Sequence, residues 1–292
     1  MLPITKAMPK EMLPIGKVPL IQYAIEEIAA SGISEIILIA APGKSTIQEY
    51  FERDKRLEKV LEQKGRYKDA ELIRSLSKNT VIKVVHQEHP LGLGHAVNCA
   101  RQAVGNEPFA LVLPDAFIAS QRPCIRQLLD CYQVMRGSYI AAREVEPAEY
   151  SRFGILKVSD VAEFPQNVRC LQVHGLVEKP TPEAAPSRYG VFGRYLLEPA
   201  IFDYIDNIKP LPGQEIQLTE ALSRYCHDFP TYAACFEGDH FDVGNELGLL
   251  QASVRMGLKS AGVGDEFRKY LLSMLATTDD ALAVSSTTQL NK

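Results

Sequence analysis

Apolar residues near the start of the chain recur three and four positions apart and are followed by a short run that is apolar almost throughout. The first pattern covers residues 20–29 and ends at Gly32, which predicts an amphipathic helix with a glycine after its last turn. The run Glu35–Ala40 is typical of a strand buried on both faces of a parallel sheet. The pattern then alternates between strands, at Val81–Val85 and Phe109–Pro114, and helical segments, at residues 44–78 and 92–103. This alternation predicts a doubly wound α/β sheet with helices on its faces.

The second half of the chain has shorter strand-like segments, and their spacing favours a sheet that is mixed or partly antiparallel. These segments are Ser138–Glu146, Phe153–Val158, Leu171–Val177, Tyr189–Leu196 and Thr231–Phe236. Helical patterns follow Pro199, cover Glu215–Cys226 and resume at Glu246, and the residues after about Thr277 are small and polar. We therefore expect one α/β domain over residues 1–245, C-terminal helices over residues 246–276, and a frayed tail over residues 277–292.

Composition narrows the class of protein. The 292 residues are 46% hydrophobic and 23% charged, with a formal net charge of −4, which is ordinary for a soluble globular protein. This acidic balance argues against nucleic acid as the main partner, because phosphate backbones require a basic face. No apolar run is long enough to cross a bilayer and no secretory signal is visible, so we expect no membrane association. Six scattered cysteines without a CxxC pair favour reduced thiols in the cytoplasm over disulfides.

Two loops have the chemistry of an anion site. Lys10 and Glu11 lie between prolines, and a lysine–glutamate pair in such a stiff loop suits anion binding better than a core. The segment Gln87–His95, QEHPLGLGH, joins a strand to a helix. Its glycines would allow backbone N–H groups to approach a flat or anionic ligand at the helix N-terminus. A glycine turn without a ligand is the alternative, and the sequence alone leaves both open.

Three acidic positions follow strand-like runs. Asp115 ends the buried run FALVLPD, where a carboxylate could bind a metal or a hydroxyl, although a cap or turn fits equally well. Asp242, in GDHFDVGN, taken alone fits an Asx turn best. In the sequence Glu178-Lys179-Pro180 the proline restricts Lys179 to an extended conformation, which would point the two charged side chains to opposite sides of the chain. One could then accept from sugar hydroxyls and the other neutralise phosphate, while a surface ion pair is the alternative favoured for this segment alone.

The order of these motifs along the chain is more specific than any one of them. KEMLP, QxxxxGLGHA, LPD, FG, VEKP, FGRY, GxEIQLTEAL and FDVGN follow one another between Lys10 and Asn245. In this order the chain closely resembles the bacterial UTP–glucose-1-phosphate uridylyltransferases, or UDP-glucose pyrophosphorylases, up to about Lys269. GLGHA and EIQLT are the specific features. The resemblance implies a nucleotidyltransferase fold of the Rossmann-like glycosyltransferase A type, with a mixed, mostly parallel sheet flanked by helices.

The resemblance also implies a role for each matching position. It places the catalytic groups at Lys10, Asp115, Lys179 and Asp242, of which Asp115 and Asp242 would hold Mg²⁺ and Lys179 would contact the sugar phosphate. The remaining substrate contacts fall on Glu11 beside the phosphates, on Gln87 and Gly92 at the pyrimidine base, and on Gly154, Glu178 and Gly193 at the hexose.

The activity that the resemblance implies is transfer of a uridylyl group from UTP to glucose 1-phosphate, giving UDP-glucose and pyrophosphate. A phosphate oxygen of the sugar would attack the α-phosphorus in line with the leaving pyrophosphate, which requires positioning and charge neutralisation but no covalent enzyme intermediate. Two alternatives are a catalytically weak sugar-nucleotide-binding homologue with a regulatory role and a thymidylyl- or cytidylyltransferase of the same group. The helices after Glu246 could form a contact in a homo-oligomer or close the core, and the second is preferred.

One hallmark of the family would lie before Met1. The resemblance implies a first strand and a GxGTR loop immediately upstream of MLP, with which the chain begins. Either Met1 is an internal methionine of a longer protein, or the segment has been lost. Without that strand the sheet would have two unpaired edges, and the pyrophosphate would lose part of its cradle. We therefore expect low turnover and reduced stability from the chain as given.

Overall fold

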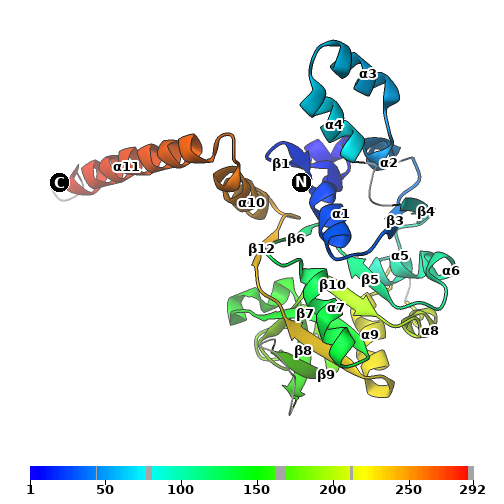
Figure 1. Cartoon of the computed structure of the whole chain (residues 1–292). Coiled ribbons are helices and arrows are strands. Elements are labelled where there is room, and N and C mark those ends of the chain that lie inside the picture. Colours follow the sequence, from blue (N-terminus) through cyan, green and yellow to red (C-terminus); the bar gives the residue numbers. More distant parts are fainter. Residues whose placement is uncertain (44, 77–80, 162–168, 211–212, 289–292) are drawn as a thin grey trace.

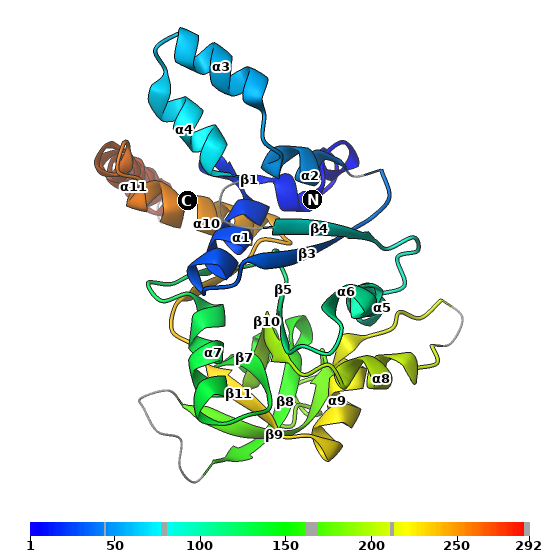
Figure 2. The ribbon, with the colours of Figure 1, turned by 45° about the vertical axis from the view of Figure 1, so that its right-hand side comes forward.

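The computed structural model describes residues 1–43, 45–76, 81–161, 169–210 and 213–288. Its largest sheet has six strands in the order β5, β10, β7, β11, β9, β8 (Figures 1 and 2). These are β5 (Phe109–Val112), β7 (Ser138–Glu144), β8 (Gly154–Asp160), β9 (Cys170–Glu178), β10 (Tyr189–Leu197) and β11 (Thr231–Cys235). All six overlap segments that the apolar pattern predicts as strands, so these predictions are confirmed.

Alternate residues of the central strand β7 face opposite layers of helices, as the pleat of a strand requires. Ile140 and Ala142 belong to one core and Tyr139 and Ala141 to another, and all four are fully buried. The helices are α5 (Leu93–Cys99), α8 (Ile201–Asp206) and α9 (Leu218–Asp228) on the first face and α7 (Cys124–Val134) on the second (Figure 2). The sheet is thus the middle layer of three, which confirms the α/β class.

The direction of the strands differs from the expectation of a mostly parallel sheet. In the large sheet β7 and β11 pair in parallel, whereas the described neighbours β5–β10, β10–β7, β11–β9 and β9–β8 are antiparallel. The mixed α/β architecture is confirmed, but antiparallel pairs predominate. For β8 and β9 the reason is local, because the connection between Asp160 and Cys170 is shorter than the roughly twelve residues that a parallel crossover needs.

A separate parallel pair, β3 (Glu35–Ala40) and β4 (Val81–His86), lies beside α1 (Leu20–Ala30) and apart from the large sheet in space (Figure 2). Both strands and the helix lie where the sequence predicts them. Within the described residues β3 pairs only with β4, and β5 pairs only with β10. The described strands therefore do not form one continuous sheet, and backbone pairing does not join β3 and β4 to the large sheet.

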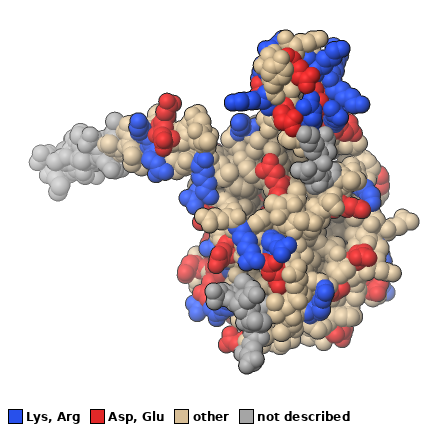
Figure 3. All heavy atoms as spheres, viewed as in Figure 1, with Lys and Arg blue, Asp and Glu red and all other residues tan. Residues whose placement is uncertain are grey.

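The charged stretch that was expected to form two helices contains three. They are α2 (Ser45–Phe51), α3 (Lys55–Gln63) and α4 (Tyr67–Ser75), and residues 44 and 77–78 of that stretch lie outside the described residues. The helices α3 and α4 pack against each other and project at one end of the molecule, where acidic and basic side chains gather (Figure 3).

The C-terminal helices α10 (Glu246–Lys259) and α11 (Gly264–Thr288) behave differently from each other. Helix α10 closes a small core that includes Ile15, Phe117 and Ala252, so closing the core is confirmed for this helix. Helix α11 projects away from the body (Figure 1). The frayed tail predicted from residue 277 is helical as far as Thr288, because this stretch contains no glycine or proline to end a helix. No helix in the described ranges is both long and apolar enough to cross a membrane.

Candidate active site

Asp115 and Asp242 are brought together by a small sheet of two strands. β6 (Ala116–Ala119) pairs antiparallel with β12 (Asp239–Asp242), so the residue that precedes β6 lies beside the last residue of β12. The Val243 amide donates to the Asp115 carbonyl at 3.0 Å, which extends this pairing by one step. The pairing therefore unites two aspartates that are far apart in the sequence.

The two carboxylates converge on one small volume. A Cβ placed on Gly244 would lie 3.1 Å from Asp242 Oδ1 and 4.0 Å from Asp115 Oδ2. Carboxylate oxygens suit a hard divalent cation such as Mg²⁺, which is commonly held by one or two carboxylates with water and substrate phosphates completing the shell. In the described residues no group of three or more His, Cys, Asp or Glu forms a complete protein cage. The pair thus fits a metal that is shared with a phosphate ligand.

Each aspartate also has a basic neighbour. Lys10 Nζ donates to Asp115 Oδ2 at 2.6 Å, and Arg152 Nη2 donates to Asp242 Oδ2 at 3.1 Å. Partial burial acts to lower the pKa of Lys10, but the charges of Asp115, Glu11 and Asp242 raise it above its ordinary value, so the ammonium stays charged. Among the described contacts Glu11 makes no hydrogen bond or ion pair with the rest of this set, and its effect on Lys10 is through charge alone.

The start of α10 is fixed against the Asp242 end of β12. Asn245 caps α10, because its Oδ1 accepts from the Gly248 amide at 2.9 Å. Its Nδ2 donates at 2.9 Å both to the carbonyl and to Oδ2 of Asp242. A Cβ on Gly248 would lie only 1.9 Å from the Asp242 carbonyl oxygen, so only glycine allows this approach.

Gly193 lies against the turn that carries Asp115. The pairing of β10 with β7 shifts register between Val191 and Tyr195, which makes a β-bulge at this point. Gly193 has φ of +63°, and a Cβ there would lie 2.8 Å from the Cβ of Ala116. The glycine therefore allows the turn to approach β10 closely.

A buried ion pair that the sequence reasoning missed supports the same turn. Arg194 is only 2% exposed, and its guanidinium makes two hydrogen bonds to Glu27 Oε2 and one to Oε1, at 2.9 to 3.1 Å. Its Nη1 donates to the carbonyls of Leu113 and Gly193 at 2.9 and 3.1 Å. Glu27 also accepts from the Ile125 amide at the start of α7. The signal was an arginine inside the apolar run FGRYLL and a glutamate within the apolar helix of residues 20–29.

Glu178 and Gly154 lie opposite each other on β9 and β8. A Cβ on Gly154 would lie 3.3 Å from Glu178 Oε2, so the glycine leaves free space beside this carboxylate. Thr219, which the sequence reasoning did not single out within EIQLT, donates to the same oxygen at 2.6 Å. Tyr195 lies near both Glu178 and Asp115, and burial followed by these two charges raises the pKa of its hydroxyl. These residues link Glu178 to the aspartates, and we call the region between Asp115, Asp242 and Glu178 the cleft.

Lys179 does not have the extended conformation that Pro180 predicts. Its φ is +44°, the only positive φ of a non-glycine residue in the described ranges. The Lys179 amide donates to the Phe153 carbonyl at 3.1 Å, which continues the pairing of β9 with β8 and turns the chain. Lys179 Nζ lies 3.8 Å from Glu178 Oε1, so the two side chains are neighbours rather than on opposite sides. Tertiary pairing here overrides the local preference of a residue before proline.

The loop with Gln87 and Gly92 meets the EIQLT segment. Gln87 Nε2 donates to the Gly92 carbonyl at 3.2 Å and lies 2.9 Å from His95 Nδ1, which holds the loop together. Gly92 has φ of +101°, and a Cβ there would lie 2.8 Å from the Ile216 carbonyl oxygen. The Gly94 amide donates to that same carbonyl at 2.8 Å. This contact places the loop next to the start of α9, which carries the Glu178 partner.

Comparisons with known proteins agree on one family. A family model described as "Nucleotidyl transferase" matches residues 1–257. The UTP–glucose-1-phosphate uridylyltransferase of Staphylococcus haemolyticus (strain JCSC1435) is 42% identical over 270 residues, which are 92% of each chain. A second relative, the UTP–glucose-1-phosphate uridylyltransferase YngB of Bacillus subtilis (strain 168), is 40% identical over 94% of this chain and 89% of its own length.

Solved structures give the same answer. A UDP-glucose pyrophosphorylase from Acinetobacter baumannii superposes with a TM-score of 0.84 at 34% identity, covering 94% of both chains. A UTP-bound form from Acinetobacter baumannii has a TM-score of 0.84 at 33% identity, with 93% of both chains covered. A UDP-glucose pyrophosphorylase complexed with UDP-glucose has a TM-score of 0.78 at 33% identity, over 89% of this chain and 94% of that one.

Proposed function

Because this chain belongs to the nucleotidyl transferase family, we propose that its cleft transfers a uridylyl group from UTP to glucose 1-phosphate, giving UDP-glucose and pyrophosphate. The relatives that match almost the whole chain are UTP–glucose-1-phosphate uridylyltransferases, and this similarity assigns the same activity to this enzyme. The observation that carries the assignment to this cleft is the convergence of the Asp115 and Asp242 carboxylates beside Lys10.

The proposed reaction needs the two phosphates to be aligned and their charge neutralised, because the attacking phosphate oxygen is already ionised at neutral pH. Mg²⁺, held by Asp115 and Asp242 when bound, would supply charge neutralisation at the α-phosphate. Lys10 lies 2.6 Å from Asp115 and is kept charged, which suits it to the nucleotide phosphates. No side chain is assigned as nucleophile or general base.

The remaining roles follow from what each side chain can donate or accept. Glu178, with one oxygen held by Thr219, would accept from hydroxyls of the hexose through the other oxygen. Lys179 would neutralise the sugar phosphate. The Gln87–Gly92 loop would meet the pyrimidine base, and Gly193 would keep the turn of Asp115 close to the sugar side. The six cysteines are free thiols, which supports a cytoplasmic enzyme.

The test is an assay of pyrophosphate release with Mg²⁺, glucose 1-phosphate and UTP, dTTP or CTP in turn. We expect UTP to be the fastest nucleotide and Asp242→Asn to abolish turnover while circular dichroism and melting temperature stay unchanged. Asp239→Asn is the matched control, because Asp239 begins the same strand but pairs with Arg255. Unchanged turnover in Asp242→Asn would remove this residue from the metal site. Faster turnover with dTTP or CTP would reassign the base.

A further inference from the structure

The two aspartates of the cleft face two basic side chains, one each. Lys10 contacts Asp115 at 2.6 Å and Arg152 contacts Asp242 at 3.1 Å. The four charges sum to zero. A divalent cation that approaches without an accompanying anion is therefore attracted by two carboxylates and repelled by an ammonium and a guanidinium at nearly the same distance.

Arg152 is held in place by its own surroundings. It ends the short 3-10 helix Pro147–Arg152, and its guanidinium lies 5.6 Å from the ring centroid of Phe153. Nη1 donates to Glu149 Oε1 at 3.2 Å, while Nη2 donates to Asp242. If Asp242 is taken by another cation, Glu149 remains as a carboxylate partner for the same guanidinium. Arg152 can therefore leave Asp242 and still have a carboxylate partner in Glu149.

Arg152 occupies one oxygen of the Asp242 carboxylate. Asp242 Oδ1 accepts from the Gly244 amide at 3.1 Å, and Oδ2 accepts from Arg152 and from Asn245. A hard cation binds carboxylate oxygens directly and at short range. Oδ2 already accepts from two donors, so a metal ion that binds this carboxylate through both oxygens must take the place of one of them.

We propose that Arg152 is a counter-ion which a divalent cation must displace from Asp242, so that the free protein binds the cation weakly and takes it up together with the anionic nucleotide. This inference rests on the proposed function, because it takes Asp115 and Asp242 as the metal site. A nucleoside triphosphate changes the balance, because its negative charge offsets Lys10 and Arg152. The affinities for cation and nucleotide are then coupled, and the coupling acts equally in both directions.

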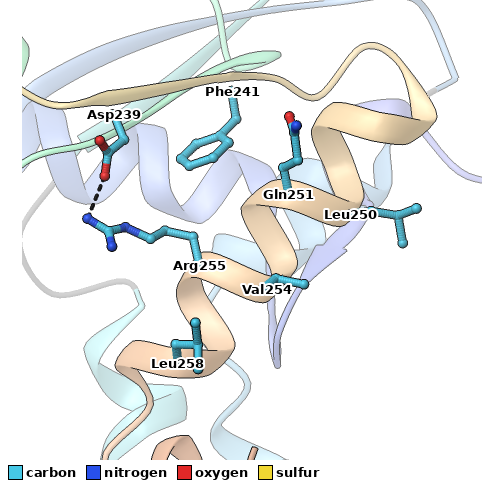
Figure 4. A pocket seen from close by; sticks show the side chains of 7 residues that line it. All are labelled: Asp239, Phe241, Leu250, Gln251, Val254, Arg255 and Leu258. Carbon is cyan, nitrogen blue, oxygen red and sulfur yellow. Dashed lines mark ion pairs between the residues drawn. The ribbon is translucent and has the colours of Figure 1, made fainter. Parts of the chain in front are cut away.

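The test measures Mn²⁺ binding to the free protein at low salt, from the electron paramagnetic resonance signal of unbound Mn²⁺. Arg152→Gln is expected to bind Mn²⁺ about three- to tenfold more tightly than the wild type, because a repelling charge and a competitor are both removed. Arg152→Lys keeps the charge and should stay closer to the wild type. Arg255→Gln is the matched control, because Arg255 pairs with Asp239 of the same strand but lies on α10 (Figure 4), and its affinity should not change.

The opposite sign would overturn the proposal. If Arg152 served mainly to orient Asp242 as a ligand, Arg152→Gln would bind Mn²⁺ as strongly as the wild type or more weakly. Undetectable binding of Mn²⁺ by this variant would contradict the proposal in the same way. An equal gain in Arg255→Gln would reduce the effect to net charge and also contradict the proposal. The assignment of Asp242 to the metal site, which belongs to the proposed function, is tested separately. It would be contradicted if adding Asp242→Asn to Arg152→Gln left the affinity for Mn²⁺ unchanged. Circular dichroism on each variant checks that the fold is kept.

Discussion

At the scale of single residues, Lys179 combines an unusual backbone with a proposed substrate contact. A left-handed conformation costs an ordinary residue roughly 1–2 kcal/mol, and it persists here because the Lys179 amide is paired with Phe153. Strain of this kind is concentrated at functional sites, where a side chain must be presented in one direction. Lysine occupies this position although glycine would fit the backbone better, which supports a role for its ammonium.

Replacement of Lys179 should separate stability from binding. We expect the free energy of unfolding of Lys179→Gly to be higher than that of Lys179→Ala by up to about 1 kcal/mol. The reason is that glycine has no Cβ and is not strained at positive φ. Both variants should raise the KM for glucose 1-phosphate far more than the KM for UTP. Urea unfolding and steady-state kinetics measure the two effects, and equal changes in both KM values would contradict the proposed role.

At the scale of elements, the hairpin of α3 and α4 is held by charge more than by apolar packing. Arg53 and Arg74 both donate to Glu58, which is largely buried, and Arg74 also pairs with Glu62. The hydrogen bonds from Arg53, together with those from Arg74, lower the pKa of Glu58 to about 2. We therefore expect the stability of this hairpin to depend on pH.

The acid sensitivity of this hairpin has a definite sign and range. The Glu58 pKa in the folded chain lies below its ordinary value of 4.5, so its contribution is fully present above pH 4.5 and is lost as the pH falls towards about 2. Amide hydrogen exchange should therefore show protection falling in α3 and α4 over this range before it falls in β7. In Glu58→Gln the hairpin should already be less protected at pH 7. A hairpin that stays as protected as β7 at pH 3 would refute this.

The Arg194–Glu27 pair joins α1, β10 and α7 and supports the turn of Asp115. We expect Glu27→Gln to destabilise the fold by about 3–5 kcal/mol, because it leaves a buried guanidinium without its counter-charge. The double variant Glu27→Met, Arg194→Met should lose less than the single variant, since no unpaired charge remains buried. Urea unfolding gives both values. A double variant less stable than Glu27→Gln would show that the pair is irreplaceable by apolar packing.

At the scale of the whole molecule, apolar periodicity located most strands and helices but could not show how they meet. β3, β4 and the strands of the large sheet lie where runs of apolar residues predict them. The β6–β12 pairing joins segments more than a hundred residues apart, and two four-residue strands have too little periodicity to reveal it. The contact of Arg152 with Asp242 could not be predicted either, because nothing in the motif SRFG indicates it. The site is formed by pairing between distant segments, and local sequence patterns do not reveal which segments pair.

The arm formed by α11 should be dispensable for the cleft. Its described contact with the body is at its start, where Phe267 packs on Gly257, and Tyr270, Leu272 and Leu275 are exposed. We expect a chain that ends at Ser260 to keep the Kd for UDP-glucose and to change its melting temperature by no more than about 4 °C. Isothermal titration calorimetry and a thermal melt measure these quantities. A weaker Kd would show that α11 supports the cleft after all.

Asn245 donates to Asp242 and accepts from the Gly248 amide, and these two hydrogen bonds limit which substitutions the chain can accept. Any side chain larger than hydrogen at position 248 would push α10 off the backbone that presents the Asp242 carboxylate. Substitution at the start of α10 is therefore limited by the position of Asp242. A change at position 245 or 248 that removes the cap or the close approach is therefore expected to move the Asp242 carboxylate as well.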